Sequence, residues 1–69
     1  MNNFYIEIGK KIKEKRKNKG WSREKLATLS YISDKFLYDI EVGKKGMSAE
    51  TLYKISKALD ISADWLLDG

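Results

Sequence analysis

The chain contains no cysteine, no proline and no histidine among its 69 residues. Without cysteine it can form neither a disulfide nor a thiolate metal site, which favours a reducing compartment such as the cytoplasm. Without histidine or cysteine it also lacks the usual nucleophile and base of an enzyme. The nearest acid pair, Asp60 and Asp64, is better explained as loop and helix-cap chemistry. We therefore expect no enzyme activity, no cofactor and no bound metal.

Long apolar stretches are missing as well. A helix needs about 20 apolar residues to cross a bilayer, and no run in the sequence approaches that length. The N-terminus carries no apolar signal core either. These absences predict a soluble, cytoplasmic protein that does not enter a membrane, and the short chain predicts one domain over residues 1–69.

Positive charge is concentrated near the N-terminus. The net charge is +4; residues 1–21 carry seven Lys or Arg against two Glu (+5), whereas residues 46–69 carry two Lys against four acids (−2). A basic chain suits a polyanionic partner such as nucleic acid. Charge alone discriminates poorly, because a lysine-rich helix is commonly just a solvated face. We expect most lysines of the first helix to add only long-range attraction.

Apolar residues recur at helical spacing in five segments, which run over roughly 3–18, 22–30, 33–42, 48–59 and 62–67. Serine, a preferred N-cap residue, stands at the start of the last four. The side chains expected to face the core are Ile8, Ile12, Leu26, Leu29, Phe36 or Leu37, Ile40, Leu52, Ile55, Ala58 and Leu59. No segment alternates as a strand does, so the sequence predicts a compact all-α fold of five helices.

The second and third segments are short and nearly adjacent. A turn of three or four residues around Tyr31 separates them, and two short helices joined in this way make a helix-turn-helix. We place this unit between Ser22 and Glu41. Such a unit lays its second helix in the major groove of DNA while its first helix crosses the backbone.

Three runs of residues resemble one known family. WSREKLA at residues 21–27 looks like the start of its second helix, IEVGK at residues 40–44 like the close of its third, and ISADWLL at residues 61–67 like its C-terminal ending. Their order and spacing resemble the Xre-like family, the Cro and phage-repressor type of helix-turn-helix protein. The resemblance implies a lambda-repressor-like domain that binds double-stranded DNA as a small transcriptional regulator, and we expect it to act as a repressor.

The resemblance also implies which residues meet DNA. Candidates for reading base edges lie on the third helix, and they are Ser33, Asp34, Lys35, Tyr38 and Asp39. Candidates for phosphate contacts are Ser22, Arg23, Lys44 and Lys45. Several of these keep an alternative. Asp34 accepts from a cytosine amino group or only favours the helix dipole, and Tyr38 contacts DNA or only covers the core edge. Ser33 contacts DNA or only caps its helix, and Lys35, Lys44 and Lys45 contact DNA or are only solvated.

Other residues are expected to serve the scaffold. Arg16 and Glu41 look like the buried ion pair of the family, which ties the first helix to the end of the third. One such domain reaches only a few bases, so we expect a homodimer on an inverted-repeat operator. Its interface candidates are Ile61, Trp65 and Leu66, with core packing as the alternative for Trp65 and Leu66. No small-molecule ligand is expected.

One departure from the family pattern bears on the geometry. Tyr31 stands in the turn where the family usually has glycine, so either the turn is strained or its path differs. A second function also stays open, because fold does not fix function and the predicted reading surface is nearly neutral. The alternative is a protein-interaction module on the same fold, such as an antitoxin-like or anti-repressor partner.

Overall fold

The computed structural model describes residues 3–68. Its five helices are α1 (Asn3–Asn18), α2 (Arg23–Leu29), α3 (Asp34–Glu41), α4 (Ala49–Leu59) and α5 (Ala63–Leu67). No strand occurs in this described part of the chain, so the all-α class with five helices is confirmed. The predicted domain also includes residues 1, 2 and 69, which lie outside the described residues.

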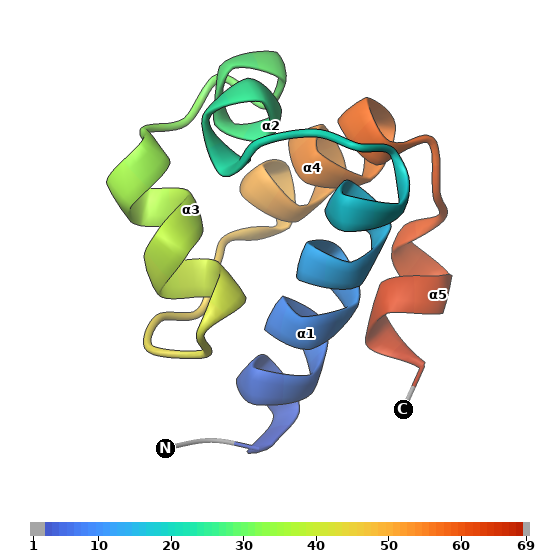
Figure 1. Cartoon of the computed structure of the whole chain (residues 1–69). Helices are drawn as coiled ribbons and strands as arrows, with labels where there is room; N and C mark the ends of the chain where they lie inside the picture. The colour runs from blue at the N-terminus through green and yellow to red at the C-terminus, as the bar shows by residue number, and fades with distance from the viewer. Residues whose placement is uncertain (1–2, 69) are drawn as a thin grey trace.

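The first helix runs through the middle of the molecule. α3 lies along one side of α1 and α5 along the other, as Figure 1 shows. α2 packs against α3 and α4, and α4 closes the fold behind α1 (Figure 1). This arrangement leaves one long side of α3 at the edge of the molecule, without another helix over it.

Each helix after the first begins at a serine cap. The side-chain oxygens of Ser22, Ser33, Ser48 and Ser62 accept the backbone N–H three residues further on, at 3.0, 3.0, 3.1 and 3.0 Å. Such a bond satisfies an amide that the first helical turn leaves without a partner. The four helix starts predicted from serine are therefore confirmed.

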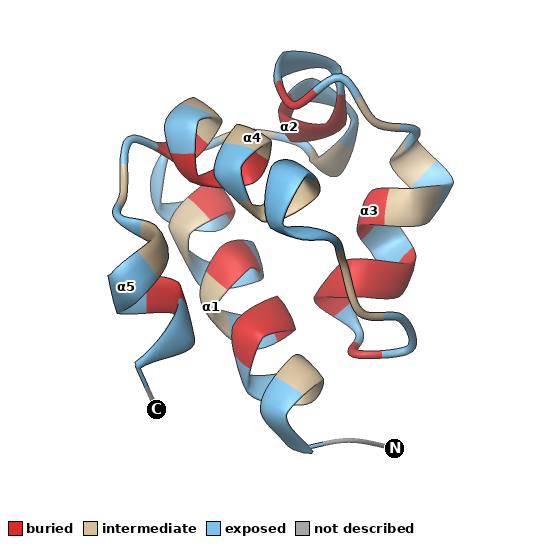
Figure 2. Ribbon diagram, turned by 180° about the vertical axis from the view of Figure 1, so that it is seen from behind, coloured by how far each residue is buried: buried red, intermediate tan, exposed pale blue. Residues whose placement is uncertain are grey.

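Buried residues occur in all five helices, and Figure 2 colours these segments of the ribbon red. The buried apolar members of the core are Ile8, Ile12, Leu26, Ala27, Leu37, Ile40, Ile55, Leu59 and Leu66. Leu29 was expected here, and that expectation is wrong, because its side chain is 44% exposed. The buried stripe of α2 passes through Leu26, Ala27 and Ser30 instead, which turns Leu29 toward solvent.

Gly9 permits a close approach of α1 and α3. A Cβ at this position would lie 2.3 Å from the carbonyl oxygen of Ile40 and 2.6 Å from that of Glu41. Glycine inside a helix normally disfavours the helix, so its presence needs a reason such as this contact. The approach fixes where the C-terminal end of α3 sits against α1.

Candidate nucleic-acid interface

Residues 30–33 connect α2 to α3 in a tight turn. The Ile32 N–H donates to the Ala27 carbonyl at 3.0 Å, and the Tyr31 N–H donates to the Thr28 carbonyl at 3.2 Å. Tyr31 has φ of 57°, in the left-handed region where a Cβ costs about 1 kcal/mol or more. Of the two alternatives for this turn, a strained backbone or a different path, the structure shows the strained left-handed backbone.

An ion pair links α2 and α3 at their first residues. Arg23 Nε donates to Asp34 Oδ1 at 2.8 Å, and Arg23 Nη2 donates to Asp34 Oδ2 at 3.2 Å. The guanidinium also lies over the Tyr38 ring, 5.0 Å from its centroid. Hydrogen bonds from Arg23 lower the pKa of Asp34 below its ordinary value of 3.8, and Asp34 raises the pKa of Arg23. Both groups therefore stay charged at neutral pH.

The pairing of Arg23 with Asp34 was not among the predictions from the sequence. A signal was present, because each residue directly follows an N-cap serine and the two charges are opposite. In a helix-turn-helix the N-terminal residues of the second helix contact base edges while the first helix crosses the DNA backbone. The Arg23–Asp34 pair lies at the predicted DNA surface and is partly exposed, at 37% and 43% of the two side chains.

Asp39 does not face outward. Its side chain is 2% exposed, so the expectation that it points toward base edges is wrong. The loop after α3 folds back over it, because the amides of Lys44 and Lys45 donate to the Asp39 carbonyl at 2.8 and 3.3 Å. Its carboxylate lies 3.7 Å from the Nζ of Lys35 and 3.5 Å from that of Lys45. Asp39 thus holds two of the predicted DNA-contacting cations.

The remaining candidates for DNA contact are exposed. Lys35 and Tyr38 lie on the outer side of α3, and Lys44 and Lys45 lie in the loop that follows it. Gly43 begins that loop with φ of 77°, and its missing side chain makes room for Ile6 of α1, which a Cβ would approach to 2.6 Å. The exposed cations therefore flank both ends of α3.

The capping serines at the two helix starts are also exposed. The hydroxyl oxygens of Ser22 and Ser33 accept the backbone amides of Lys25 and Phe36, both at 3.0 Å. A hydroxyl that accepts in this way still has its own hydrogen to donate. Both serines can therefore cap a helix and donate to a phosphate or a base at the same time.

Arg16 and Glu41 form a buried ion pair behind this surface. Arg16 Nε and Nη2 donate to the two Glu41 oxygens at 2.8 and 3.0 Å, while Arg16 Nη1 donates to the Trp21 carbonyl at 3.0 Å. The two side chains are 9% and 3% exposed. This geometry ties α1 to α3 and to the residue before the cap of α2, so it holds the helix-turn-helix on its scaffold.

The C-terminal helix is fastened to α1 through Trp65. The ammonium groups of Lys11 and Lys15 lie 5.0 and 4.9 Å from the Trp65 ring centroid, and Lys11 donates to the Trp65 carbonyl at 3.0 Å. Leu66 is 2% exposed, so its assignment to a dimer interface is wrong: its side chain belongs to the core. Trp65 remains 41% exposed and Ile61 partly exposed.

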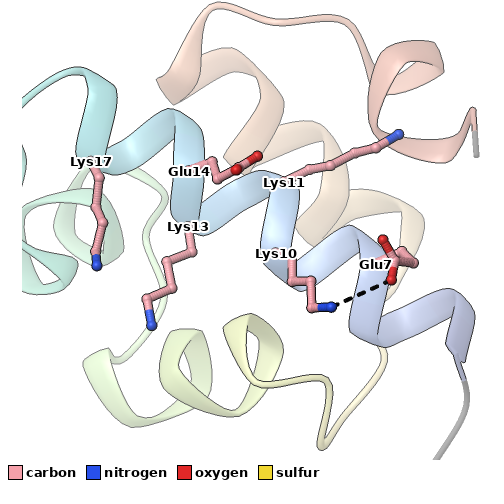
Figure 3. Close-up of a pocket in the computed structure, with 6 residues that line it drawn as sticks. All are labelled: Glu7, Lys10, Lys11, Lys13, Glu14 and Lys17. Carbon is pink, nitrogen blue, oxygen red and sulfur yellow. Dashed lines mark ion pairs between the residues drawn. The ribbon is translucent and has the colours of Figure 1, made fainter.

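The lysine-rich face of α1 forms a shallow depression, drawn in Figure 3. The charged residues that line it are Glu7, Lys10, Lys11, Lys13, Glu14 and Lys17. Lys10 pairs with Glu7 at 3.6 Å, while Lys11 extends toward α5 (Figure 3). Apart from Lys11, which is held against Trp65, these side chains are exposed, and the four lysines add positive potential to this face of α1.

Residues 3–68, which the structure describes, contain no group of three or more His, Cys, Asp or Glu side chains placed to hold a metal ion. None of their helices combines the length and apolar character that a transmembrane span requires.

The two capped helices, the tight turn and the exposed side of α3 define a helix-turn-helix protein. The sequence matches the helix-turn-helix family over residues 12–66, so the chain belongs to that family. Its members are DNA-binding regulators, which agrees with the Xre-like resemblance of the motifs.

Curated relatives of the chain are regulators by name. It is similar to the control protein C.BamHI of Bacillus amyloliquefaciens, with 37% identity over 68 residues that cover 97% of this chain and 84% of that protein. It is also similar to the HTH-type transcriptional regulator SinR of Bacillus subtilis, with 39% identity over 88% of this chain. The matched part makes up 56% of SinR.

Solved structures agree with the fold. The restriction-modification controller protein C.AhdI from Aeromonas hydrophila superposes with a TM-score of 0.90 at 31% identity, covering 94% of this chain and 98% of that one. The clp gene regulator ClgR from Corynebacterium glutamicum gives a TM-score of 0.85 at 30% identity, covering 93% and 83%. The fold of this chain is therefore the one found in this controller protein and this gene regulator.

Proposed function

We propose that this chain regulates transcription, as a repressor, by binding an inverted-repeat operator as a homodimer with α3 in the major groove. The observation that carries the proposal is the exposed side of α3, where Lys35 and Tyr38 lie beside the Arg23–Asp34 pair. This side is flanked by the loop cations Lys44 and Lys45. Base-edge contacts and phosphate contacts therefore have donors on one continuous surface.

A homodimer gives this small domain enough reach. One domain of this size contacts only a few base pairs, and two-fold pairing over half-sites one helical turn apart adds length and affinity. Ile61 and Trp65 of the C-terminal segment are the proposed contact residues. Sedimentation should show association that weakens in Ile61→Gln and Trp65→Gln, whereas a monomer at all concentrations would contradict the dimer.

The proposal implies that the protein is not an enzyme and that it works in the cytoplasm, where its DNA target lies. The control protein C.BamHI and the transcriptional regulator SinR, to which the chain is similar, support the first statement. The second follows only from the proposed target and stays a prediction.

The deciding experiment is selection of bound sequences from a pool of random duplexes, followed by titration of binding against salt. We expect an inverted repeat to be enriched, and log K to fall steeply with log salt because phosphate contacts release counterions. Lys35→Ala should relax preference at one base pair and weaken binding by about 1 to 3 kcal/mol. Failure to enrich any sequence above non-specific binding would favour the alternative, a protein-interaction module.

A further inference from the structure

Asp34 of the Arg23–Asp34 pair is an acid at a position proposed to contact base edges. A carboxylate in the major groove can only accept, so among base edges it suits the amino group of cytosine. The phosphates of DNA repel such a carboxylate, and repulsion of this kind favours its protonated form. A lone acid at the start of α3 would therefore be a poor reader of bases.

The geometry around Asp34 removes that difficulty. Both of its oxygens accept from the same guanidinium, at 2.8 and 3.2 Å, so the pair is neutral as a whole and the carboxylate is held in one orientation. The Tyr38 ring, 5.0 Å from the guanidinium, supports the other partner from α3. Arg23, Asp34, Lys35 and Tyr38 together line one shallow, open depression on the predicted DNA surface.

Both residues of the pair keep hydrogen-bonding groups that can contact DNA. A guanidinium carries five N–H groups, and the two bonds to Asp34 leave the others available to a phosphate. Each carboxylate oxygen has a second lone pair, so Asp34 can accept from a base while it accepts from Arg23. The lowered pKa of Asp34 agrees with a carboxylate that stays ionised beside DNA.

We propose that Arg23 determines base choice through Asp34: the pair enters the groove as one unit in which Asp34 accepts from a cytosine and Arg23 binds the adjacent phosphate. The inference rests on the proposed function, and it makes Arg23 a positioning residue as well as a phosphate contact. Loss of an independent phosphate contact weakens binding to all sequences alike. Loss of Arg23 from this unit should also reduce the preference for one base pair.

The test compares base preference in variants that remove each half of the pair. The bound site is first selected for the unmodified chain, and competition binding then measures all four base pairs at each position. We expect about tenfold preference for cytosine at one position of each half-site, in the range of a good base contact. Asp34→Asn should move that preference to adenine, because an amide pairs with adenine N6 and N7.

Arg23→Gln is the decisive variant. At the base position whose preference changes in Asp34→Asn, we expect Arg23→Gln to lower the preference for cytosine to about twofold. Preferences at the other positions should persist. Arg23→Lys should retain an intermediate preference for cytosine. The matched control is Lys44→Gln, which removes one positive charge from the loop and should weaken every sequence alike. Circular dichroism confirms that each variant is folded.

Some results overturn this inference but leave the proposed function standing. One is that Arg23→Gln keeps the full preference for cytosine at that base position, and another is that Asp34→Asn changes base preference at no position. Uniform tighter binding by Asp34→Asn also overturns it, since the acid then only screens Arg23 from phosphates. If the unmodified chain enriches no site, the proposed function itself fails and the inference fails with it.

Discussion

Arg16 of α1 and Glu41 of α3 form a two-bond ion pair inside the protein, with donor–acceptor distances of 2.8 and 3.0 Å. The same guanidinium donates to the Trp21 carbonyl at 3.0 Å. One side chain therefore joins α1, the end of α3 and the residue that precedes the cap of α2. The Arg16–Glu41 pair therefore fixes the position of α3 relative to α2 from the side opposite the proposed DNA surface. The proposed contacts with base edges depend on this position.

Arg16→Met should destabilise the domain by about 3 to 5 kcal/mol, because it leaves the Glu41 carboxylate buried without its partner. The free energy of unfolding in urea measures this loss. Lys13→Met, on an exposed position of the same helix, is the control and should stay within about 0.5 kcal/mol. The double variant Arg16→Met with Glu41→Leu should recover part of the loss; a single-variant loss below about 1 kcal/mol contradicts the structural role.

Gly9→Ala should destabilise the fold although alanine is the better helix former. The added Cβ would lie 2.3 Å from the Ile40 carbonyl oxygen, so α1 and α3 must separate, and overpacking of this kind typically costs about 1 to 3 kcal/mol. The gain in helix propensity offsets about 1 kcal/mol of this cost. Lys10→Ala on the exposed face serves as the comparison, and urea unfolding is the measurement. A stabilised Gly9→Ala variant would show that the two helices do not need this contact.

The sequence predicted the helices well because their starts are chemically marked. Each serine cap acts locally, within three residues, and the apolar spacing records which side of a helix is buried. The errors at Leu29, Asp39 and Leu66 have another cause. How far each helix is rotated and what the next loop covers depend on contacts far along the chain, as the fold of residues 44 and 45 over Asp39 shows. The positions of Arg23 and Asp34 directly after two capping serines were a signal for their pairing, but the angle between α2 and α3 is what brings the two side chains together.

Tyr31→Gly should stabilise the protein by about 1 kcal/mol. The backbone of Tyr31 has φ of 57°, a region that glycine adopts without the Cβ penalty, and its side chain is 83% exposed and so loses little packing. The melting temperature should rise accordingly. Tyr31→Ala keeps the Cβ and should show no such gain. If both variants lose stability equally, the Tyr31 ring rather than its backbone governs the turn.

Asp39→Asn should strengthen binding to non-specific DNA and steepen its salt dependence. The carboxylate of Asp39 lies within 3.7 Å of the Lys35 ammonium and 3.5 Å of the Lys45 ammonium, so its removal frees both cations for phosphates. Each added phosphate contact increases the slope of log K against log salt by about 0.9. Fluorescence anisotropy with a duplex of arbitrary sequence measures the slope.

The control for that experiment is Asp60→Asn, which makes the same change of charge at the left-handed C-cap of α4, a conformation that asparagine tolerates. It should leave the slope nearly unchanged. Equal slopes for Asp39→Asn and the unmodified chain would show that the buried carboxylate does not restrain the two lysines.

The Arg23–Asp34 pair predicts how stability responds to acid. Arg23 lowers the pKa of Asp34 in the folded state below the ordinary value of 3.8, so the unfolded chain binds this proton more readily. Stability from the pair is therefore complete above that value and is lost as the pH falls through the lower pKa of the folded state. Asp34→Asn lacks this contribution at every pH. The urea midpoints of the unmodified chain and Asp34→Asn should differ most near pH 7 and converge as the pH drops toward 2. A constant difference over that range would mean that the charge of Asp34 does not stabilise the fold.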